Sequence, residues 1–183
     1  MIVNGYALAS GGELECADLR GGALPFASLG CANLTGANLD AARLSFADLT
    51  NARLVGASMR LARLNGASLP GARLQDVDLT GADVRVAWLN DADLRGATLV
   101  DADLTGSDLA GAALSGATLA GATLDACNLQ GATYDDMTVF PDGFSPEDAG
   151  MSRLAAVEPH VHGAHARMSS SRAPRVCAEH TLA

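Results

Sequence analysis

The chain has 183 residues and a formal net charge of −9, so we expect no direct binding to nucleic acid. Aromatic residues make up only 4% of the chain, which excludes an ordinary globular core, and no run of 18 apolar residues predicts a membrane-spanning helix. The first residues lack the basic region and apolar run of a secretory signal peptide, so we expect a cytoplasmic protein without a membrane partner.

Residues 1–13 form a short segment ahead of a long repeat. We expect this segment, with Met1 to Tyr6 at its start, to act as an N-terminal cap. An uncovered edge of backbone donors and acceptors would invite another chain to add a strand.

Residues 14–136 repeat with a period of five. From Leu14 to Tyr134 a large apolar residue returns at every fifth position, 25 times, and only Met59, Val84 and Tyr134 replace leucine. A small residue, usually alanine, stands two positions before each of them. A period of five fits neither the 3.6 residues of a helix nor the two of a strand, so it predicts a coil with sides of five residues.

The repeated unit reads A-[D/N]-L-x-G, as in residues 32–36 and 102–106. It resembles the pentapeptide repeat family closely over about two thirds of the chain. The resemblance implies an all-β solenoid, a right-handed quadrilateral β-helix of about six coils in which four units complete one turn. Leucines and alanines then point to the axis, and glycines such as Gly36 and Gly56 lie at corners, where positive φ is easiest.

Residues 137–157 break the pattern and are predicted to form a C-terminal cap with a short helix. Ser145 can be the N-cap and Pro146 suits the first helical position. Phe140, Phe144 and Met151 would close the last coil, or would form the interface of a homodimer joined at its C-terminal ends. The sequence leaves open whether the protein is a monomer or such a dimer.

Residues 158–183 contain few large apolar residues and are predicted to be a disordered tail. His160, His162 and His165 cluster there, and such a cluster could bind a metal. We favour a solvated tail, because a disordered segment offers no preorganised ligands. We therefore expect neither a metal nor a cofactor.

Residues twenty apart stack on the same side of a four-sided coil. This spacing predicts a basic band near the third coil and an acidic band over the fourth and fifth. One interpretation pairs Arg63 with Asp83 and Arg73 with Asp93 as exposed ion pairs between coils. The other notes that Asp83 lies beside Asp103, an unfavourable arrangement of like charges that a partner could exploit.

Phe26 and Phe46 are also twenty residues apart and should form an exposed ladder, with Val86 further along the same column. Scattered exposed apolar residues are normal on proteins. The alternative is a surface for a partner or for self-association.

The sequence contains no catalytic set of residues in the repeats, so we expect no enzyme. Solenoids commonly present an extended surface, which favours a protein-binding or scaffold module with an unknown partner. The family resemblance adds an alternative, because some pentapeptide repeat proteins mimic DNA, bind DNA gyrase or another topoisomerase, and protect it from quinolones. The acids to test for such mimicry are Asp78, Asp83, Asp93, Asp103 and Asp108. The arginine band and the leucine-rich core depart from that pattern.

Overall fold

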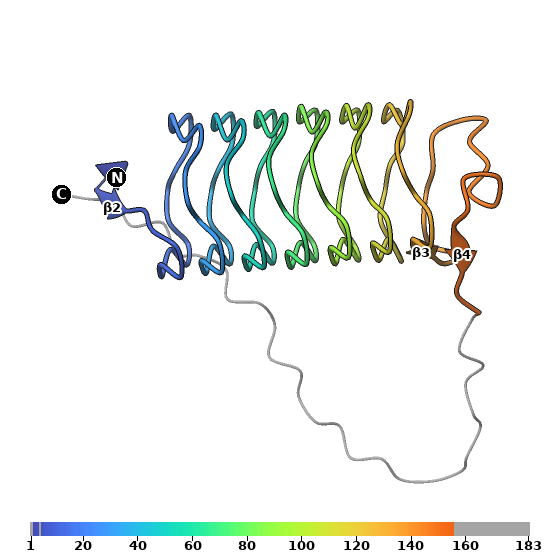
Figure 1. The fold of residues 1–183 in the computed structure, drawn as a ribbon, viewed down its shortest axis with the longest axis horizontal. Helices are drawn as coiled ribbons and strands as arrows, with labels where there is room; N and C mark the ends of the chain where they lie inside the picture. The colour runs from blue at the N-terminus through green and yellow to red at the C-terminus, as the bar shows by residue number, and fades with distance from the viewer. Residues whose placement is uncertain (1, 4, 156–183) are drawn as a thin grey trace, which may run out of the picture.

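The repeats form a straight rod of stacked coils in the computed structural model, which describes residues 2–3 and 5–155 (Figure 1). The described residues contain no helix and four named strands, each of two residues. The strands are β1 Ile2–Val3, β2 Tyr6–Ala7, β3 Thr133–Tyr134 and β4 Ser152–Arg153. Between β2 and β3 the coils are joined by single β-bridges rather than by long strands.

Each bridge joins two residues that are twenty positions apart, beginning with Glu13 and Asn33. The Leu14 N–H donates to the Asn33 carbonyl at 2.7 Å, and the Asn33 N–H donates back to the Gly12 carbonyl at 2.9 Å. The same pattern repeats around four columns of bridges, one for each side of the coil. The four-sided turn of twenty residues is therefore as the family resemblance implied, and the coils pair in a parallel register.

A tight turn closes each corner between two sides. The Ala17 N–H donates to the Leu14 carbonyl at 3.1 Å, and the residue before Ala17 has a positive φ. A positive φ at only the third of the four residues is typical of a type II turn. Gly56 fills this position with φ +64°, and Phe46 fills it in another coil with φ +59°. The prediction that the glycines lie at corners is confirmed, but several corners carry other residues.

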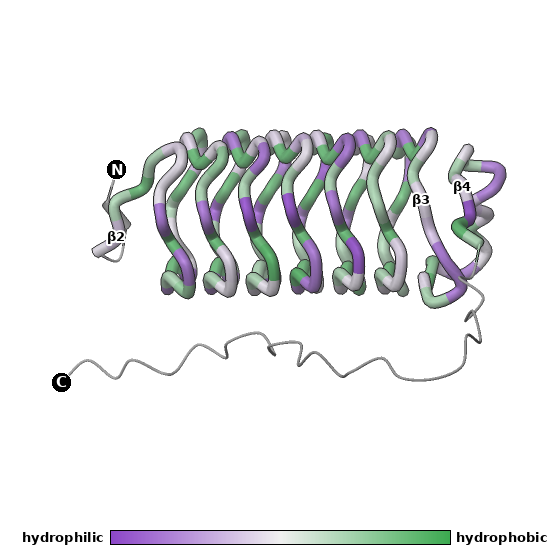
Figure 2. Tube along the Cα trace, turned by 90° about the horizontal axis from the view of Figure 1, so that it is seen from below, coloured by the Kyte–Doolittle hydropathy of each residue, from purple (hydrophilic) through white to green (hydrophobic). Residues whose placement is uncertain are grey.

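The core is a single column of leucines and alanines along the axis. The central residues from Leu14 to Leu119 are at most 2% exposed. Each buried leucine stabilises the fold by about 2 kcal/mol. Figure 2 shows hydrophilic and hydrophobic segments following one another along each coil, which reflects the alternation of outward and inward positions.

The N-terminal end carries a small antiparallel hairpin, in which β1 pairs with β2. The ring of Tyr6 is half-buried against the core, and Leu8 is buried. The hairpin lies beyond the first coil at one end of the rod (Figure 1).

The predicted C-terminal helix is wrong, because residues 145–150 make one tight turn and the chain then returns to the ladder. Ser145 accepts a hydrogen bond from the Asp148 N–H at 3.4 Å, in the manner expected of a cap. However, β4 pairs in parallel with β3, with Ser152 beside Thr133. A segment this short does not nucleate a stable helix by itself, whereas the open edge of β3 supplies backbone partners at once.

Aromatic rings cover the last coil at this end. Tyr134 and Phe140 meet edge to face with centroids 5.4 Å apart, and Phe140 stacks on Phe144 at 5.2 Å. Phe140 and Phe144 pack against the core, and Met151 is 7% exposed. All three residues therefore lie at the last coil, and their role as a cap or as a dimer interface stays a prediction. The predicted tail, with the clustered His160, His162 and His165, lies outside the described residues.

Candidate functional site

One side of the rod combines large exposed apolar side chains with two arginines, and we call it the aromatic side. Its central column is Ala23, Arg43, Arg63, Asp83, Asp103 and Thr123. One corner column is Phe26, Phe46, Gly66, Val86, Gly106 and Ala126. The other corner column is Gly21, Ala41, Leu61, Gly81, Asp101 and Gly121.

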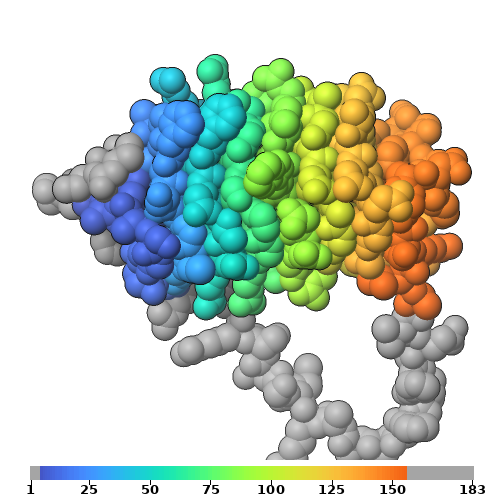
Figure 3. Space-filling model, in the orientation of Figure 1, coloured from blue at the N-terminus to red at the C-terminus, as the bar shows by residue number. Residues whose placement is uncertain are grey.

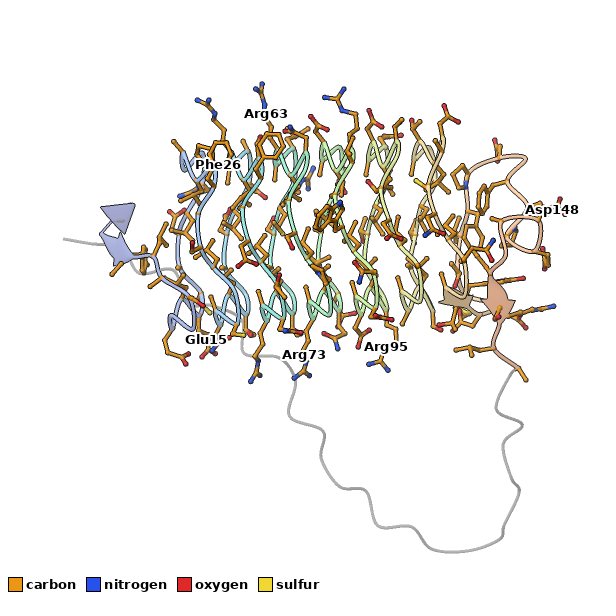
Figure 4. The ribbon with its side chains drawn as sticks, viewed as in Figure 1. Glu15, Phe26, Arg63, Arg73, Arg95 and Asp148 are labelled. Atoms are coloured by element: carbon orange, nitrogen blue, oxygen red, sulfur yellow. The ribbon has the colours of Figure 1, made fainter. Side chains whose placement is uncertain are left out.

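The opposite side of the rod serves as a comparison. Its central column is Glu13, Asn33, Arg53, Arg73, Asp93, Ala113 and Thr133. Figure 4 shows Phe26 and Arg63 near one edge of the rod, and Arg73 and Arg95 at the opposite edge. None of the large exposed hydrophobic residues among the described residues lies in the central column of this opposite side.

Phe26 and Phe46 form the ladder that their spacing predicted. Their ring centroids are 5.4 Å apart with an angle of 11° between the ring planes. The two residues are 72% and 54% exposed. The Phe46 ring leans over Gly66 in the next coil, where a Cβ would collide with it. Gly66 therefore allows the ladder to lie along the rod, and sequence reasoning did not single it out.

The exposed apolar residues of the corner columns occupy strained backbone positions. Phe26, Phe46, Leu61 and Val86 all have φ between +54° and +59°, where glycine is the easiest residue. A non-glycine residue costs about 1–2 kcal/mol in this conformation. Each of these side chains is more than half exposed, so the free energy gained by its partial burial on the rod offsets little of the cost of this backbone conformation. Non-glycine residues on all four corner columns share this strain, so what distinguishes the aromatic side is that its strained corners carry large apolar side chains.

The ion pairs differ from the predicted pairs between coils. Asp83 binds Arg85 of the same side with Nε–Oδ1 and Nη2–Oδ2 distances of 2.8 Å, and Asp93 binds Arg95 in the same two-pronged way. Residues two apart point to the same side of an extended segment, and the planar guanidinium matches a carboxylate well. The sequence signal is an arginine two residues after an aspartate, as in residues 83–85 and 93–95.

These hydrogen bonds also set the charge state of the acids. The hydrogen bonds from Arg85 hold the pKa of Asp83 below its ordinary value, and those from Arg95 do the same for the pKa of Asp93. Each carboxylate therefore stays ionised, with a cation bound beside it.

Four arginines make no ion pair among the described residues. They form two stacked pairs, Arg43 beside Arg63 on the aromatic side and Arg53 beside Arg73 on the opposite side. All four side chains are exposed. Arg43 and Arg63 repel each other because they carry like charges on adjacent coils. An acidic group of another molecule, bound beside the phenylalanine ladder, would relieve this repulsion.

The five candidate acids do not form one surface. Asp83 and Asp103 lie together on the aromatic side, and Asp93 lies on the opposite side, while Asp78 and Asp108 belong to the two remaining columns. Each carboxylate also accepts a hydrogen bond from the backbone N–H two residues later, as at Asp103 and Thr105, 3.0 Å apart. These acids therefore have a structural role in the sides of the coil, and the structure brings only Asp83 and Asp103 together.

Charge is distributed unevenly along the rod. Residues 13–75 contain six arginines and five acids, a net charge of +1. Residues 76–136 contain two arginines and eleven acids, a net charge of −9. The predicted order of a basic band followed by an acidic band therefore extends to the whole rod, whose net charge becomes negative towards its C-terminal half.

The rod surface offers no enclosed site in the part of the chain that the structure describes. Two shallow depressions lie at the C-terminal cap, one beside Phe144 and the other beside Tyr134. No group of three or more His, Cys, Asp or Glu residues among residues 2–3 and 5–155 could hold a metal ion. The same residues contain no helix long and apolar enough to cross a membrane. The face seen in Figure 3 is convex without a deep hollow.

Comparisons with known proteins identify the repeat. The family model for pentapeptide repeats matches eight copies, in overlapping segments at 13–56, 27–66, 57–96, 87–125 and 97–133. No curated protein sequence matches the chain.

Solved structures of similar proteins include Rfr23, a pentapeptide repeat protein from the cyanobacterium Cyanothece 51142, at 36% identity and a TM-score of 0.30. That match covers 54% of this chain and 63% of Rfr23. The pentapeptide repeat protein alr5209 from Nostoc Pcc 7120 is 31% identical over 64% of this chain and 84% of its own, with a TM-score of 0.30. QnrB1, a plasmid-mediated fluoroquinolone resistance protein, is 21% identical over 78% of this chain and 77% of its own, with a TM-score of 0.45.

These TM-scores are low, so the assignment depends on the family model, which spans more than half of the chain in the register of the observed bridges. The chain therefore belongs to the pentapeptide repeat family, whose members form right-handed β-helices.

Proposed function

We propose that the protein is a non-catalytic rod that works in the cytoplasm by binding another protein through its aromatic side. The observation that carries the proposal is the pair of stacked, exposed rings of Phe26 and Phe46 beside the unpaired Arg43 and Arg63. Aromatic residues and arginine are enriched at the energetically dominant positions of protein interfaces.

The large exposed apolar side chains at the strained corners support the same surface. A glycine or asparagine at the positions of Phe26 and Phe46 would fold with less backbone strain. Exposed phenylalanine rings do not compensate for that strain in the isolated rod. A partner that buried both rings would remove from water the apolar area that the rod alone leaves exposed, and this burial would stabilise the complex.

Affinity capture with matched variants tests the proposal. The purified rod is compared with Phe26→Asp/Phe46→Asp on the aromatic side and with Arg53→Asp/Arg73→Asp on the opposite side. We expect the first variant to lose proteins that the unaltered rod retains, and the second to retain them. If all three rods retained the same proteins, the proposal that the aromatic side is the binding surface would be rejected.

DNA mimicry directed at DNA gyrase is the second candidate, and the charge of −9 over residues 76–136 favours it. The binding of Arg85 and Arg95 to Asp83 and Asp93 weakens it, because these arginines neutralise acids that a DNA mimic would present. A gyrase supercoiling assay with and without a fluoroquinolone tests this candidate. Inhibition that Asp103→Arg/Asp108→Arg weakens would support mimicry, and no effect of the unaltered rod on gyrase would exclude it.

A further inference from the structure

We propose that the protein bound by the aromatic side is a second copy of the same rod, placed antiparallel to the first with the two aromatic sides face to face. This inference rests on the proposed function and names its partner. It follows from the order of charges and side-chain sizes along the three columns of that side.

Charge complementarity fixes the register. In an antiparallel pair whose two-fold axis crosses the rods between Arg63 and Asp83, Arg63 faces Asp83 of the second copy. Arg43 then faces Asp103 of the second copy. The two-fold symmetry repeats both contacts, so four ion pairs span the interface. Both unpaired arginines thereby meet acids that Arg85 of the second copy also contacts, Asp83 at 2.8 Å and Asp103 at 3.6 Å, so each carboxylate is shared between two arginines.

Side-chain sizes complement each other in the same register. The two-fold axis places equivalent corners together, so Phe26 faces Ala126 and Phe46 faces Gly106 of the second copy. At the other corner, Leu61 faces Gly81 of the second copy. Gly106 and Ala126 leave room for the two rings, whereas the space over Gly66 and Gly81 is filled by Phe46 and Leu61 of the same chain. At those two levels the second copy therefore meets apolar side chains, not open glycines. The Phe46 ring leans over Gly66 towards the two-fold axis, so it also reaches the level of Val86 of the second copy.

Other arrangements lose this match. A parallel pair places Arg43 opposite Arg43 and Asp103 opposite Asp103. An antiparallel pair shifted by one coil places Arg63 opposite Arg63, or Asp83 opposite Asp83. Like charges across an interface are costly, so the charges favour a single orientation and register. The polarity of the whole rod, +1 followed by −9, also favours antiparallel copies over parallel ones.

The interface is small, and this sets the expected affinity. Six coils spaced about 4.8 Å apart give a contact about 25 Å long. One side of the coil therefore supplies on the order of 400 Å² from each copy, at the low end of specific interfaces. We expect a weak, reversible dimer that forms best at low ionic strength, because salt screens exposed charge pairs.

Charge exchange between two variants tests the arrangement. Arg43→Asp/Arg63→Asp makes the central column wholly acidic over four coils, and Asp83→Arg/Asp103→Arg makes it wholly basic. Arginine suits these positions, because Arg43 and Arg63 already occupy the same place in other coils. Sedimentation equilibrium at low salt, from about 1 to about 500 µM, measures self-association of each variant and of their equimolar mixture.

We expect the unaltered rod to dimerise, each variant alone to dimerise at least about tenfold more weakly, and the mixture to recover at least the original affinity. Arg53→Asp/Arg73→Asp, with the same charge change on the opposite side, should leave the dimerisation constant within about twofold. Far-ultraviolet circular dichroism confirms that every variant keeps the fold.

Three results would overturn the inference: an unaltered rod that stays monomeric throughout, equal weakening by the opposite-side variant, or a mixture that does not recover. A rod that stays monomeric but still captures another protein through Phe26 and Phe46 would refute the dimer and leave the proposed function standing. Dimers that form in the predicted register, without capture of any other protein, would support both.

Discussion

Replacing Val86 with glycine should stabilise the rod, although the change removes an apolar side chain. Val86 is β-branched, has φ +54° and is 61% exposed. The left-handed conformation costs a non-glycine residue about 1–2 kcal/mol. Glycine recovers that cost but loses about 0.5–1 kcal/mol through the greater freedom of the unfolded chain. Because little of Val86 is buried, we expect a net gain of about 0.5–1 kcal/mol.

The matched control is Val100→Gly. Val100 is half-buried and is the second residue of its corner turn, a position without a positive φ. Glycine there relieves no strain and removes buried apolar area, so we expect a loss of about 1–2 kcal/mol. The two identical substitutions should therefore change stability in opposite directions.

Thermal unfolding followed by circular dichroism measures both effects. A change of 1 kcal/mol shifts the Tm of a domain of this size by about 2–4 °C. We expect Tm to rise for Val86→Gly and to fall for Val100→Gly. If Val86→Gly lowered Tm as much as the control, the corner strain on which the candidate site depends would be refuted.

Three further predictions concern other parts of the rod. Leu64→Ala, at a position 1% exposed, should cost about 2–5 kcal/mol in urea unfolding, and a loss below 1 kcal/mol would contradict the packed axial core. Arg85→Ala should raise the pKa of Asp83 towards about 3.9, as measured by NMR titration. Because the pKa of Asp83 is lowered in the folded rod, the ionised carboxylate stabilises the fold at pH values above about 3.9, and this stabilisation is lost as the pH falls and Asp83 takes up a proton. The variant should therefore lose up to about 1 kcal/mol of stability at pH 7 and little at pH 2. An unchanged pKa would show that the pair does not persist in solution. Cys31 is an exposed free thiol and should react with iodoacetamide faster than Cys127. Burial raises the pKa of the Cys127 thiol, and its Sγ donates a hydrogen bond to the Leu104 carbonyl at 2.8 Å. Equal reaction rates of the two thiols, measured by peptide mapping, would contradict the burial of Cys127.

The architecture follows from the sequence because the repeat leaves little freedom. A leucine at every fifth position indicates a coil with sides of five residues, and the resemblance to pentapeptide repeats implies four sides and therefore a twenty-residue register. That register alone predicted the stacking of Phe26 on Phe46 and the bridge between Asp83 and Asp103, and both are observed.

The C-terminal cap could not be predicted in the same way. Ser145 and Pro146 favour a helix locally, but the choice depended on the backbone groups of β3, which are distant in sequence. An unsatisfied ladder edge outweighed the local preference, so β4 formed in its place.

The choice of ion-pair partners also depended on side-chain geometry, which the twenty-residue register does not give. Stacking twenty residues apart placed Arg63 beside Asp83, but it did not show that Arg85, two residues along, binds that aspartate with better geometry. As a result, the sequence predicted the positions of the charges but not which arginines remain unpaired. Arg53 and Arg73 are unpaired as well, so the exposed phenylalanine ladder beside Arg43 and Arg63 is what defines the candidate site.

Photo-crosslinking at position 46 tests the central claim, that the aromatic side is where this rod contacts other proteins. A benzoylphenylalanine at Phe46 keeps an aromatic ring in the ladder, and the same group at Asp76, on another corner column, serves as the control. The account predicts covalent adducts from position 46 and none from position 76, with adducts of twice the chain mass if the partner is a second copy. The absence of adducts at position 46, or equal adducts at both positions, would contradict it.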